Sequence, residues 1–216
     1  MQENLFISVI IPVFNSEKFI GRCLRSLINQ TLKKKNYEII IINDGSNDKT
    51  RNEIIKYKKN NFKIINNKNN LGLAKSLNIG VKAATGSLMV RVDSDDWVHK
   101  DFLNIMSTFL FHNKDLDSVA CDYTVTNSKE KNIKIENCLK KPIGCAIMFR
   151  LQHILELGLY NEKFKYAEEE AFRKIYLKKY NITRLPISLY RYRQHKNNRS
   201  KNAEMVKHFR NKLKNV

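Results

Sequence analysis

The sequence predicts an α/β domain with a mostly parallel central sheet flanked by helices. Three observations support this fold class. Short β-branched runs alternate with segments of helical spacing, as in βαβ units. The runs of the first half are almost continuously apolar, which is typical of parallel strands buried on both faces. Clusters of Asn, Asp and Gly end these runs, where turns and helix caps are expected, so the sheet should be Rossmann-like with right-handed crossovers.

The first half of the chain contains three strand–loop–helix units and a fourth strand. We expect strands over residues 6–13, 37–42, 62–65 and 87–92. Helices are expected over 19–28, 50–59 and 73–84, where apolar residues recur at helical spacing. Gly86 is expected to end the third helix in a left-handed conformation. The carboxyl ends of the parallel strands then share one edge of the sheet, where ligands bind in open α/β folds.

The second half is more irregular. We expect a helix at 101–112, a strand at 118–125, an exposed hairpin over 128–138 and a strand at 143–149. A short helix at 151–157 should stop at Gly158, and a longer helix at 166–180 precedes strands at 182–185 and 189–192. The chain has no internal repeat and no linker. Residues 1–200 are therefore predicted to form one domain, with halves 1–97 and 98–200, followed by a basic amphipathic tail, 201–216.

Composition restricts the classes of function. The formal charge of +19 favours polyanionic partners such as phosphate-bearing substrates, an anionic membrane face or nucleic acid. The four cysteines form no C-x-x-C pair and are interpreted as core thiols of a reducing compartment, which argues against structural zinc. The amino terminus lacks the pattern of a signal peptide, and the apolar runs are too short to span a bilayer. We therefore expect a cytoplasmic protein.

An acidic segment follows the fourth predicted strand. Asp93, Asp95 and Asp96 lie within four residues and precede Trp97, the only tryptophan. Carboxylates this close raise one another's pKa unless a cation compensates. Oxygen ligands suit Mg²⁺ or Mn²⁺, which would in turn hold substrate phosphates. The alternative is a cluster that caps the next helix.

Two other loops should converge with this acidic segment. Residues 12–17 and 44–48 also follow predicted parallel strands, so a nucleotide pocket at this edge is expected. Asp44 can accept a hydrogen bond from a base, and its alternative role is in a capping turn. The chain has neither a G-x-G-x-x-G loop after the first strand nor a G-x-x-x-x-G-K-[ST] loop. The main sequence evidence for a dinucleotide oxidoreductase or a P-loop enzyme is therefore missing.

Four segments follow one another in the first half of the chain. They are ISVIIPVFN at 7–15, INDGSNDKT at 42–50, NLGLA at 70–74 with Asn78, Gly80 and Gly86, and DSDDW at 93–97. In order and spacing they resemble the signature of glycosyltransferase family 2, the inverting GT-A enzymes. The resemblance extends less closely to about residue 200. It implies a GT-A fold with a small antiparallel extension on the acceptor side. It also implies a nucleotide-diphosphate sugar donor, expected to be a UDP-sugar, and Mg²⁺ or Mn²⁺ as the metal.

The resemblance also implies roles for individual residues. The implied nucleotide-sugar ligands are Pro12, Phe14 and Glu17 for the base and ribose, Asp44 for the base edge, and Asp93 and Ser94 for the ribose and diphosphate. Asp95 would ligate the metal. Lys75 would approach a donor phosphate, with plain solvent exposure as its alternative.

Inversion in one displacement needs a general base that takes the proton of the acceptor hydroxyl. In the family this base comes from an acidic pair after a G-x-[YF]-[ND]-E element. Here GLYNE at 158–162 precedes YAEEE at 166–170, so Glu169 is the implied base and Glu168 the alternative. The family usually has Glu-Asp at this pair, whereas this chain has Glu-Glu. The purely structural alternative is an acidic first turn of a helix.

The segment YRYRQH at 190–195, with Ser200, resembles the closing segment of the family. It implies that His195 is a second metal ligand and that Arg193 faces the diphosphate. A solvated histidine is the alternative. Trp97 would form a stacking wall for the acceptor sugar, or else be a half-buried packing residue.

The sequence therefore predicts a metal-dependent inverting hexosyltransferase that acts on a sugar or lipid-linked acceptor in cell-surface polysaccharide or glycolipid synthesis. A sugar-nucleotidyltransferase would need a Gly-rich basic loop after the first strand, which residues 15–17 do not supply. A basic nucleic-acid-binding protein is the non-enzymatic alternative, but no RRM, zinc-finger or helix-turn-helix pattern is present, so we expect no nucleic-acid partner.

The basic tail is the last predicted interaction surface. Met205, Phe209 and Leu213 are spaced i, i+4, i+8 among lysines and arginines. Such a helix can lie on an anionic membrane, so we expect peripheral association with the inner face of the cell membrane. A frayed terminus is the alternative.

Overall fold

The computed structural model describes residues 6–196, 198 and 202–213. Its strands form one sheet in the order β3-β2-β1-β4-β8-β6-β9-β5, with β7 paired to β6. The strands are β1 Ile7–Val13, β2 Tyr37–Asn43, β3 Phe62–Asn66, β4 Leu88–Arg91, β5 Trp97–Val98, β6 Ser118–Thr126, β7 Asn132–Glu136, β8 Ile147–Arg150 and β9 Ile182–Arg193. The helices are α1 Ile20–Ile28, α2 Thr50–Tyr57, α3 Leu73–Ala83, α4 Phe102–His112, α5 Leu151–Glu156, α6 Glu168–Tyr176 and α7 Ala203–Lys212, with a 3-10 turn at Lys34–Asn36.

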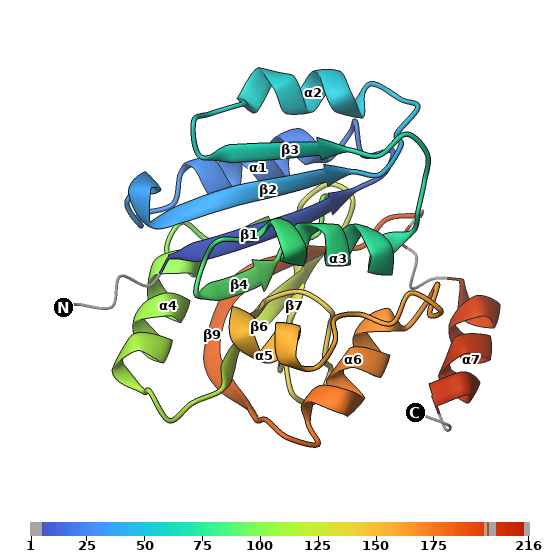
Figure 1. Cartoon of the computed structure of the whole chain (residues 1–216). Coiled ribbons are helices and arrows are strands. Elements are labelled where there is room, and N and C mark those ends of the chain that lie inside the picture. The colour runs from blue at the N-terminus through green and yellow to red at the C-terminus, as the bar shows by residue number, and fades with distance from the viewer. Residues whose placement is uncertain (1–5, 197, 199–201, 214–216) are drawn as a thin grey trace.

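The amino-terminal half is a parallel sheet between two helical layers. β1 pairs in parallel with β2 and β4, and β2 with β3, so the arrowheads of β1, β2 and β3 point the same way in Figure 1. β1 is buried along its whole length. Its residues Val9 and Ile11 pack with α1 and α4, whereas Ile10 packs with α3 on the other face. This two-sided burial is the reason that the run is continuously apolar instead of alternating.

The carboxyl-terminal half adds antiparallel pairs to this sheet. β8 runs antiparallel to both β4 and β6, β7 forms an antiparallel hairpin with β6, and β5 runs antiparallel to β9. β6 and β9 are parallel. The predicted α/β class, with a mostly parallel sheet and an antiparallel extension, is confirmed.

Two local predictions about glycine have different outcomes. Gly158 has φ +83 and follows α5, as expected for a residue that ends a helix. Gly86 was expected to do the same after α3, and that prediction is wrong: among the described glycines only Gly45, Gly72 and Gly158 have positive φ. A Cβ at Gly86 would lie 2.5 Å from the carbonyl oxygen of Phe6, so this position requires glycine because two strands approach closely there.

Element boundaries differ where tertiary contacts intervene. The helix expected at 166–180 is shorter, because Ala167 adopts a left-handed conformation with φ +57 and α6 begins after it. The two strands expected at 182–185 and 189–192 form one strand, β9, which follows β6 through a register shift. β5 was not predicted, because a two-residue strand carries no periodic signal.

The tail forms α7, which packs on the body of the protein beside α6 (Figure 1). Phe209 is buried with Phe164, Ala167 and Ala171, and Met205 and Leu213 pack against the same cluster. Arg210 makes a charge-assisted pair with Glu170 at 2.6 Å. The apolar stripe therefore faces the protein, which corrects the expectation that it is free to lie on a membrane. Among the described residues, no helix has both the length and the apolarity needed to cross a bilayer.

Candidate functional site

The carboxyl ends of β1, β2, β3 and β4 bring four loops into contact. The Ser16 and Ser94 hydroxyls lie 2.7 Å apart, which joins the loop after β1 to the acidic loop after β4. The backbone N–H of Asn15 donates to the Ser46 hydroxyl at 3.0 Å, and the N–H of Asn47 donates to the Asn15 side chain at 3.0 Å. The convergence expected from sheet topology is present.

Arg91 organises one side of the acidic loop. It ends β4, and its guanidinium donates to both oxygens of Asp93, at 2.6 and 3.1 Å. The same guanidinium donates to Glu168 at 3.3 Å. Arg91 and Glu168 are both buried, so this ion pair is little screened by water. Arg91 therefore links the acidic loop to the acidic turn that opens α6.

Asp96 holds the acidic loop from within. It is buried, and its carboxylate accepts from the Tyr190 hydroxyl at 2.8 Å and from the Arg193 N–H at 2.7 Å. The Tyr190 hydroxyl also accepts from the N–H of Asp93 at 3.1 Å. Burial, with the charges of Asp95 and Asp93, raises the pKa of Asp96 well above its usual range. Asp96 thus fixes the loop shape and is not available to a ligand.

Asp95 and His195 meet, although one hundred residues separate them. Nε2 of His195 lies 2.8 Å from Oδ2 of Asp95. The ring of Phe19, at the start of α1, stacks on the imidazole at 4.5 Å between centroids. The Asn198 side chain accepts from the His195 N–H and donates to the Arg193 carbonyl, which shapes the turn after β9. The two residues for which metal binding was predicted are therefore adjacent; Ser200 lies outside the described residues.

The predicted nucleotide ligands occupy different environments. Phe14 is 46% exposed at the end of β1, so its ring is open to a flat partner. Pro12 is buried in β1 beside Ile42. Glu17 is half-buried and accepts from the Lys49 N–H at 2.9 Å. Their contacts with a nucleotide stay predictions.

Lys75 and Asp44 illustrate the two extremes of exposure. Lys75 is exposed on the first turn of α3, and its contact with a donor phosphate stays a prediction. Asp44 is buried and accepts from the Asn67 amide at 2.8 Å and from the N–H groups of Leu71 and Gly72, both at 2.9 Å. A carboxylate offers about four acceptor positions, so one remains for a base. Asp44 therefore holds the 67–72 loop in place, and its contact with a base stays a prediction.

The acidic pair of α6 divides into two different environments. Glu168 is buried and paired with Arg91. Glu169 is half-buried, and its Cβ and Cγ lie against Gly144, where an added Cβ would come within 2.9 Å. Burial, followed by the charge of Glu168, raises the pKa of Glu169 to about 7, against the opposing effect of Arg91. A carboxylate with a pKa near neutrality is suited to general base catalysis.

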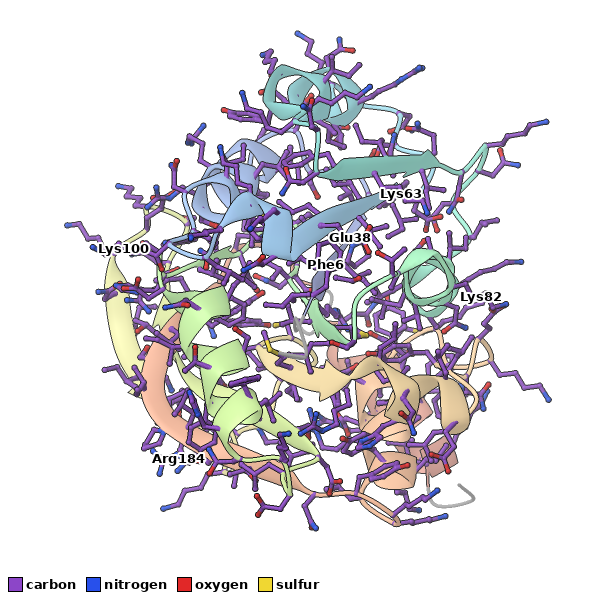
Figure 2. The ribbon with its side chains drawn as sticks, turned by 60° about the vertical axis from the view of Figure 1, so that its left-hand side comes forward. Phe6, Glu38, Lys63, Lys82, Lys100 and Arg184 are labelled. Atoms are coloured by element: carbon purple, nitrogen blue, oxygen red, sulfur yellow. The ribbon has the colours of Figure 1, made fainter. Side chains whose placement is uncertain are left out.

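A hollow lies at the opposite end of the sheet from these loops. It is a groove of about 700 Å³ at the amino ends of β1–β3, where Figure 2 labels Phe6, Glu38 and Lys63. Lys34, Lys35 and Lys59 also line it. None of the predicted site residues lines this groove, so it is separate from the acidic loop.

Comparison with known proteins identifies the family. The profile of the family described as Glycosyl transferase family 2 matches residues 8–181. The chain belongs to glycosyl transferase family 2. An uncharacterized glycosyltransferase of Haemophilus influenzae is 30% identical over 224 residues, which cover 93% of this chain and 69% of that protein. The poly(ribitol-phosphate) beta-N-acetylglucosaminyltransferase TarS of Staphylococcus aureus is 37% identical over 105 residues, which cover 48% of this chain and 18% of TarS.

Solved structures agree with this assignment. S. aureus TarS 1-349 in complex with UDP-GlcNAc superposes with a TM-score of 0.82 at 25% identity, over 96% of this chain and 65% of that one. The mannosyltransferase PcManGT from Pyrobaculum calidifontis, in complex with GDP-Man and Mn²⁺, has a TM-score of 0.76 at 16% identity and shows the fold alone. The GT-A fold and the glycosyltransferase class are confirmed. The chain spans about two thirds of the H. influenzae relative and less than a fifth of TarS.

Among the described residues, two groups of side chains were compared as possible ligands of a divalent metal in this family 2 transferase. Ligand atoms of Asp93, Asp96 and Cys145 lie within 4.8 Å of one another. However, Asp93 is paired with Arg91, Asp96 is already hydrogen-bonded, and burial raises the pKa of the Cys145 thiol well above its usual range. A protonated thiol is a poor ligand for Mg²⁺ or Mn²⁺. The Asp95 carboxylate with the His195 imidazole, 2.8 Å apart, is the donor set that fits such an ion better.

Trp97 and Arg193 are both buried and held by contacts within the protein. Trp97 is only 7% exposed, and the guanidinium groups of Arg193 and Arg22 lie over its ring at 4.6 and 5.3 Å. The ring is therefore packed, and the stacking wall for an acceptor sugar is not supported. Arg193 is buried and donates to the Asp95 carbonyl at 2.7 Å and to Glu130 at 3.0 Å. These bonds make Arg193 a support of the acidic loop, whereas its contact with a diphosphate stays a prediction.

Three residues of the site were not singled out in the sequence. Arg91 was visible as the one charge within an apolar strand, which is a signal for a buried ion pair. Tyr190 begins the segment that resembles the family's closing segment, but no role was assigned to it. Glu130 carried no signal, because its importance comes from a contact across more than sixty residues of sequence.

Proposed function

We propose that this transferase moves a sugar from a nucleotide-diphosphate sugar to an acceptor hydroxyl, with inversion and with Mg²⁺ or Mn²⁺. The observation that carries the proposal is the meeting of Asp95 and His195 at the edge where the β1, β2 and β4 loops converge. Arg91 connects this edge to the acidic turn of α6. The nucleotide-sugar donor and the base Glu169 would thus lie on opposite sides of the Arg91 guanidinium.

The proposed donor is a UDP-sugar. S. aureus TarS, which shares the fold and 25% identity, was solved in complex with UDP-GlcNAc. The open ring of Phe14 could stack on a base, and Asp44 retains one acceptor position toward it. Ser94 and Asp93 lie in the loop that would follow the ribose and diphosphate.

The residues of the chain would act in a single displacement. Glu169 takes the proton of the acceptor hydroxyl as that oxygen attacks the anomeric carbon, and the bond to the diphosphate oxygen breaks. A divalent metal, when bound by Asp95 and His195, would neutralise charge on the leaving diphosphate. Arg91 pairs with Asp93 and also holds Glu168. We therefore assign Glu168 the role of a positioning residue next to the base.

The proposed setting is the synthesis of a cell-surface polysaccharide or glycolipid. TarS is by name a poly(ribitol-phosphate) transferase, and this supports a polymer as the acceptor. The acceptor proposed for this chain is a sugar or a lipid-linked acceptor. The formal charge of +19 suits work on the cytoplasmic side of an anionic membrane.

A thermal-shift screen tests the donor and the metal together. We expect one class of nucleotide sugar to raise the melting temperature only when Mn²⁺ is present, since a ligand that binds the folded state alone stabilises it. The Asp95→Ala variant should lose the Mn²⁺-dependent part of this shift, whereas Lys82→Ala, an exposed substitution on α3, should retain it. No response to any nucleotide sugar would contradict the proposal.

A further inference from the structure

The β6–β7 hairpin and the turn after it form the most exposed part of the second half. Residues 128–135 are exposed without interruption. Among the strands that the structure describes, only β6 pairs with β7, through the register Thr124↔Ile135 and Val125↔Lys134. We refer to residues 128–141 as the hairpin surface.

Large apolar side chains project from the hairpin surface. Ile133 and Ile135 are 56% and 67% exposed, and Leu139 is 51% exposed. Residues two apart on a strand point to the same face, so the two isoleucines form one apolar ridge. Exposed apolar residues that cluster in this way mark interaction sites more often than isolated ones do.

The hairpin surface carries a net positive charge, and several of its lysines are exposed to solvent. Its sequence has five lysines and two glutamates, a net charge of +3. Glu136 is engaged by Lys134 at 2.6 Å and by Lys141 at 3.1 Å. Glu130 pairs with the buried guanidinium of Arg193. The remaining lysines, Lys129, Lys131 and Lys140, are exposed.

The turn of the hairpin is fastened to the acidic loop. Glu130, in a left-handed conformation with φ +63, accepts from Arg193 at 3.0 Å and lies 3.4 Å from the Nε of Arg22. Arg193 in turn donates to the Asp95 carbonyl. A surface that holds the hairpin would therefore also hold the acidic loop at a fixed position relative to that surface.

We infer that the hairpin surface docks on an anionic lipid bilayer, with Ile133 and Ile135 inserted among the acyl chains and the lysines at the headgroups. Lysines beside an apolar ridge match both components of such a surface. A polyanion in solution would be attracted by the lysines alone and would leave the isoleucines in water. A second copy of the chain pairing with β7 is disfavoured by Lys131 and Lys134, because charged edge residues oppose strand addition.

The inference rests on the proposed membrane association and specifies which surface carries it. Because the protein has a net charge of +19, any basic face will attract anionic vesicles to some degree. The isoleucines give the selective test, since replacing them leaves the charge unchanged. Co-sedimentation of the full chain with vesicles of phosphatidylcholine and phosphatidylglycerol is the measurement.

The test variant is Ile133→Ser with Ile135→Ser, and its matched control is Ile55→Ser with Leu155→Ser, at residues that are 55% and 51% exposed on α2 and α5. We expect the hairpin variant to bind at least roughly ten-fold more weakly than the wild type, because it loses the insertion of two apolar side chains. The control should bind as the wild type does. Far-ultraviolet circular dichroism establishes that both are folded.

The other outcomes are separable. Equal binding of wild type and hairpin variant would overturn the assignment of this surface and leave the proposed membrane association standing. No binding of the wild type would overturn both, without bearing on sugar transfer. A dimer in sedimentation velocity that is lost in the hairpin variant, with vesicle binding unchanged, would assign the surface to a second copy and overturn the inference.

Discussion

Replacement of Glu169 by glutamine should abolish transfer and at the same time stabilise the fold in a pH-dependent way. Because the proposed base acts as a carboxylate, turnover of the wild type should rise as the pH passes through about 7, the pKa to which burial and Glu168 raise this group. Glu169→Gln should have almost no turnover at any pH. Glu169→Asp, which restores the usual acidic pair of the family, keeps a carboxylate and should retain measurable activity.

The stability effect follows from the same pKa. The ordinary value is 4.5, so between 4.5 and about 7 the folded protein holds a proton on Glu169 that the unfolded chain has lost. Folding stability therefore falls as the pH rises through that window, and the loss is complete above it. The full pKa shift of Glu169 corresponds to about 3 kcal/mol in the free energy of unfolding. Because water reaches the half-buried side chain, the contribution is reduced to roughly 1–3 kcal/mol.

Urea unfolding of wild type and Glu169→Gln measures this effect. The quantity to compare is the free energy of unfolding of the variant minus that of the wild type. This difference should be about 1–2 kcal/mol larger at about pH 8 than at about pH 5. Glu204→Gln, at an exposed position on α7, should show no such difference. A pH-independent gain would refute the altered pKa. Full turnover by Glu169→Gln with loss in Glu168→Gln would move the base to Glu168.

Three further predictions concern the supports of the site. Tyr190→Phe removes the hydroxyl that donates to Asp96 and accepts from the Asp93 N–H. Urea unfolding should show that the free energy of unfolding falls by about 1–3 kcal/mol. An unchanged free energy of unfolding would contradict the buried network. Phe209→Ala should release α7 from Phe164 and Ala171, seen as faster amide hydrogen exchange in α7; unchanged protection would disprove this packing. Gly45 has φ +70, and the Cβ of an alanine there would lie 2.5 Å from the Asn69 carbonyl carbon. Gly45→Ala should therefore distort the loop 44–48 and raise the KM for the nucleotide-sugar donor. An unaltered KM would argue against a role of this loop in donor binding.

The parallel half of the fold was predictable because its strands are buried on both faces. Continuous apolar runs such as β1 and β2 have few alternatives, and the polar residues at their ends mark the ligand edge. The second half was less predictable. β9 could not be recognised as one strand, because its pairing with β6 includes register shifts that no local pattern encodes. The tail showed an amphipathic stripe, but the sequence could not tell a membrane from the cluster around Phe164 as its partner.

The acidic residues of the site were predictable from the sequence, whereas their different environments are visible only in the structure. The proximity of Asp95 and His195 was expected from the family resemblance and is observed, whereas no spacing rule would bring together residues one hundred positions apart. Local pattern could not distinguish Trp97 as a packed ring from an open one, because burial depends on Arg22 and Arg193 from other elements. The roles of Arg91 and Tyr190 likewise arise only once the strands are assembled.

Release of nucleoside diphosphate from a panel of nucleotide sugars tests the central claim most directly. With Mn²⁺, the wild type should turn over at least one sugar donor, and removal of the metal by EDTA should lower that rate by roughly a hundred-fold or more. The Asp95→Ala variant should be equally slow with and without Mn²⁺, while remaining folded. Equal rates for wild type in EDTA and Mn²⁺, together with full activity of Asp95→Ala, would contradict a metal-dependent transferase centred on Asp95 and His195.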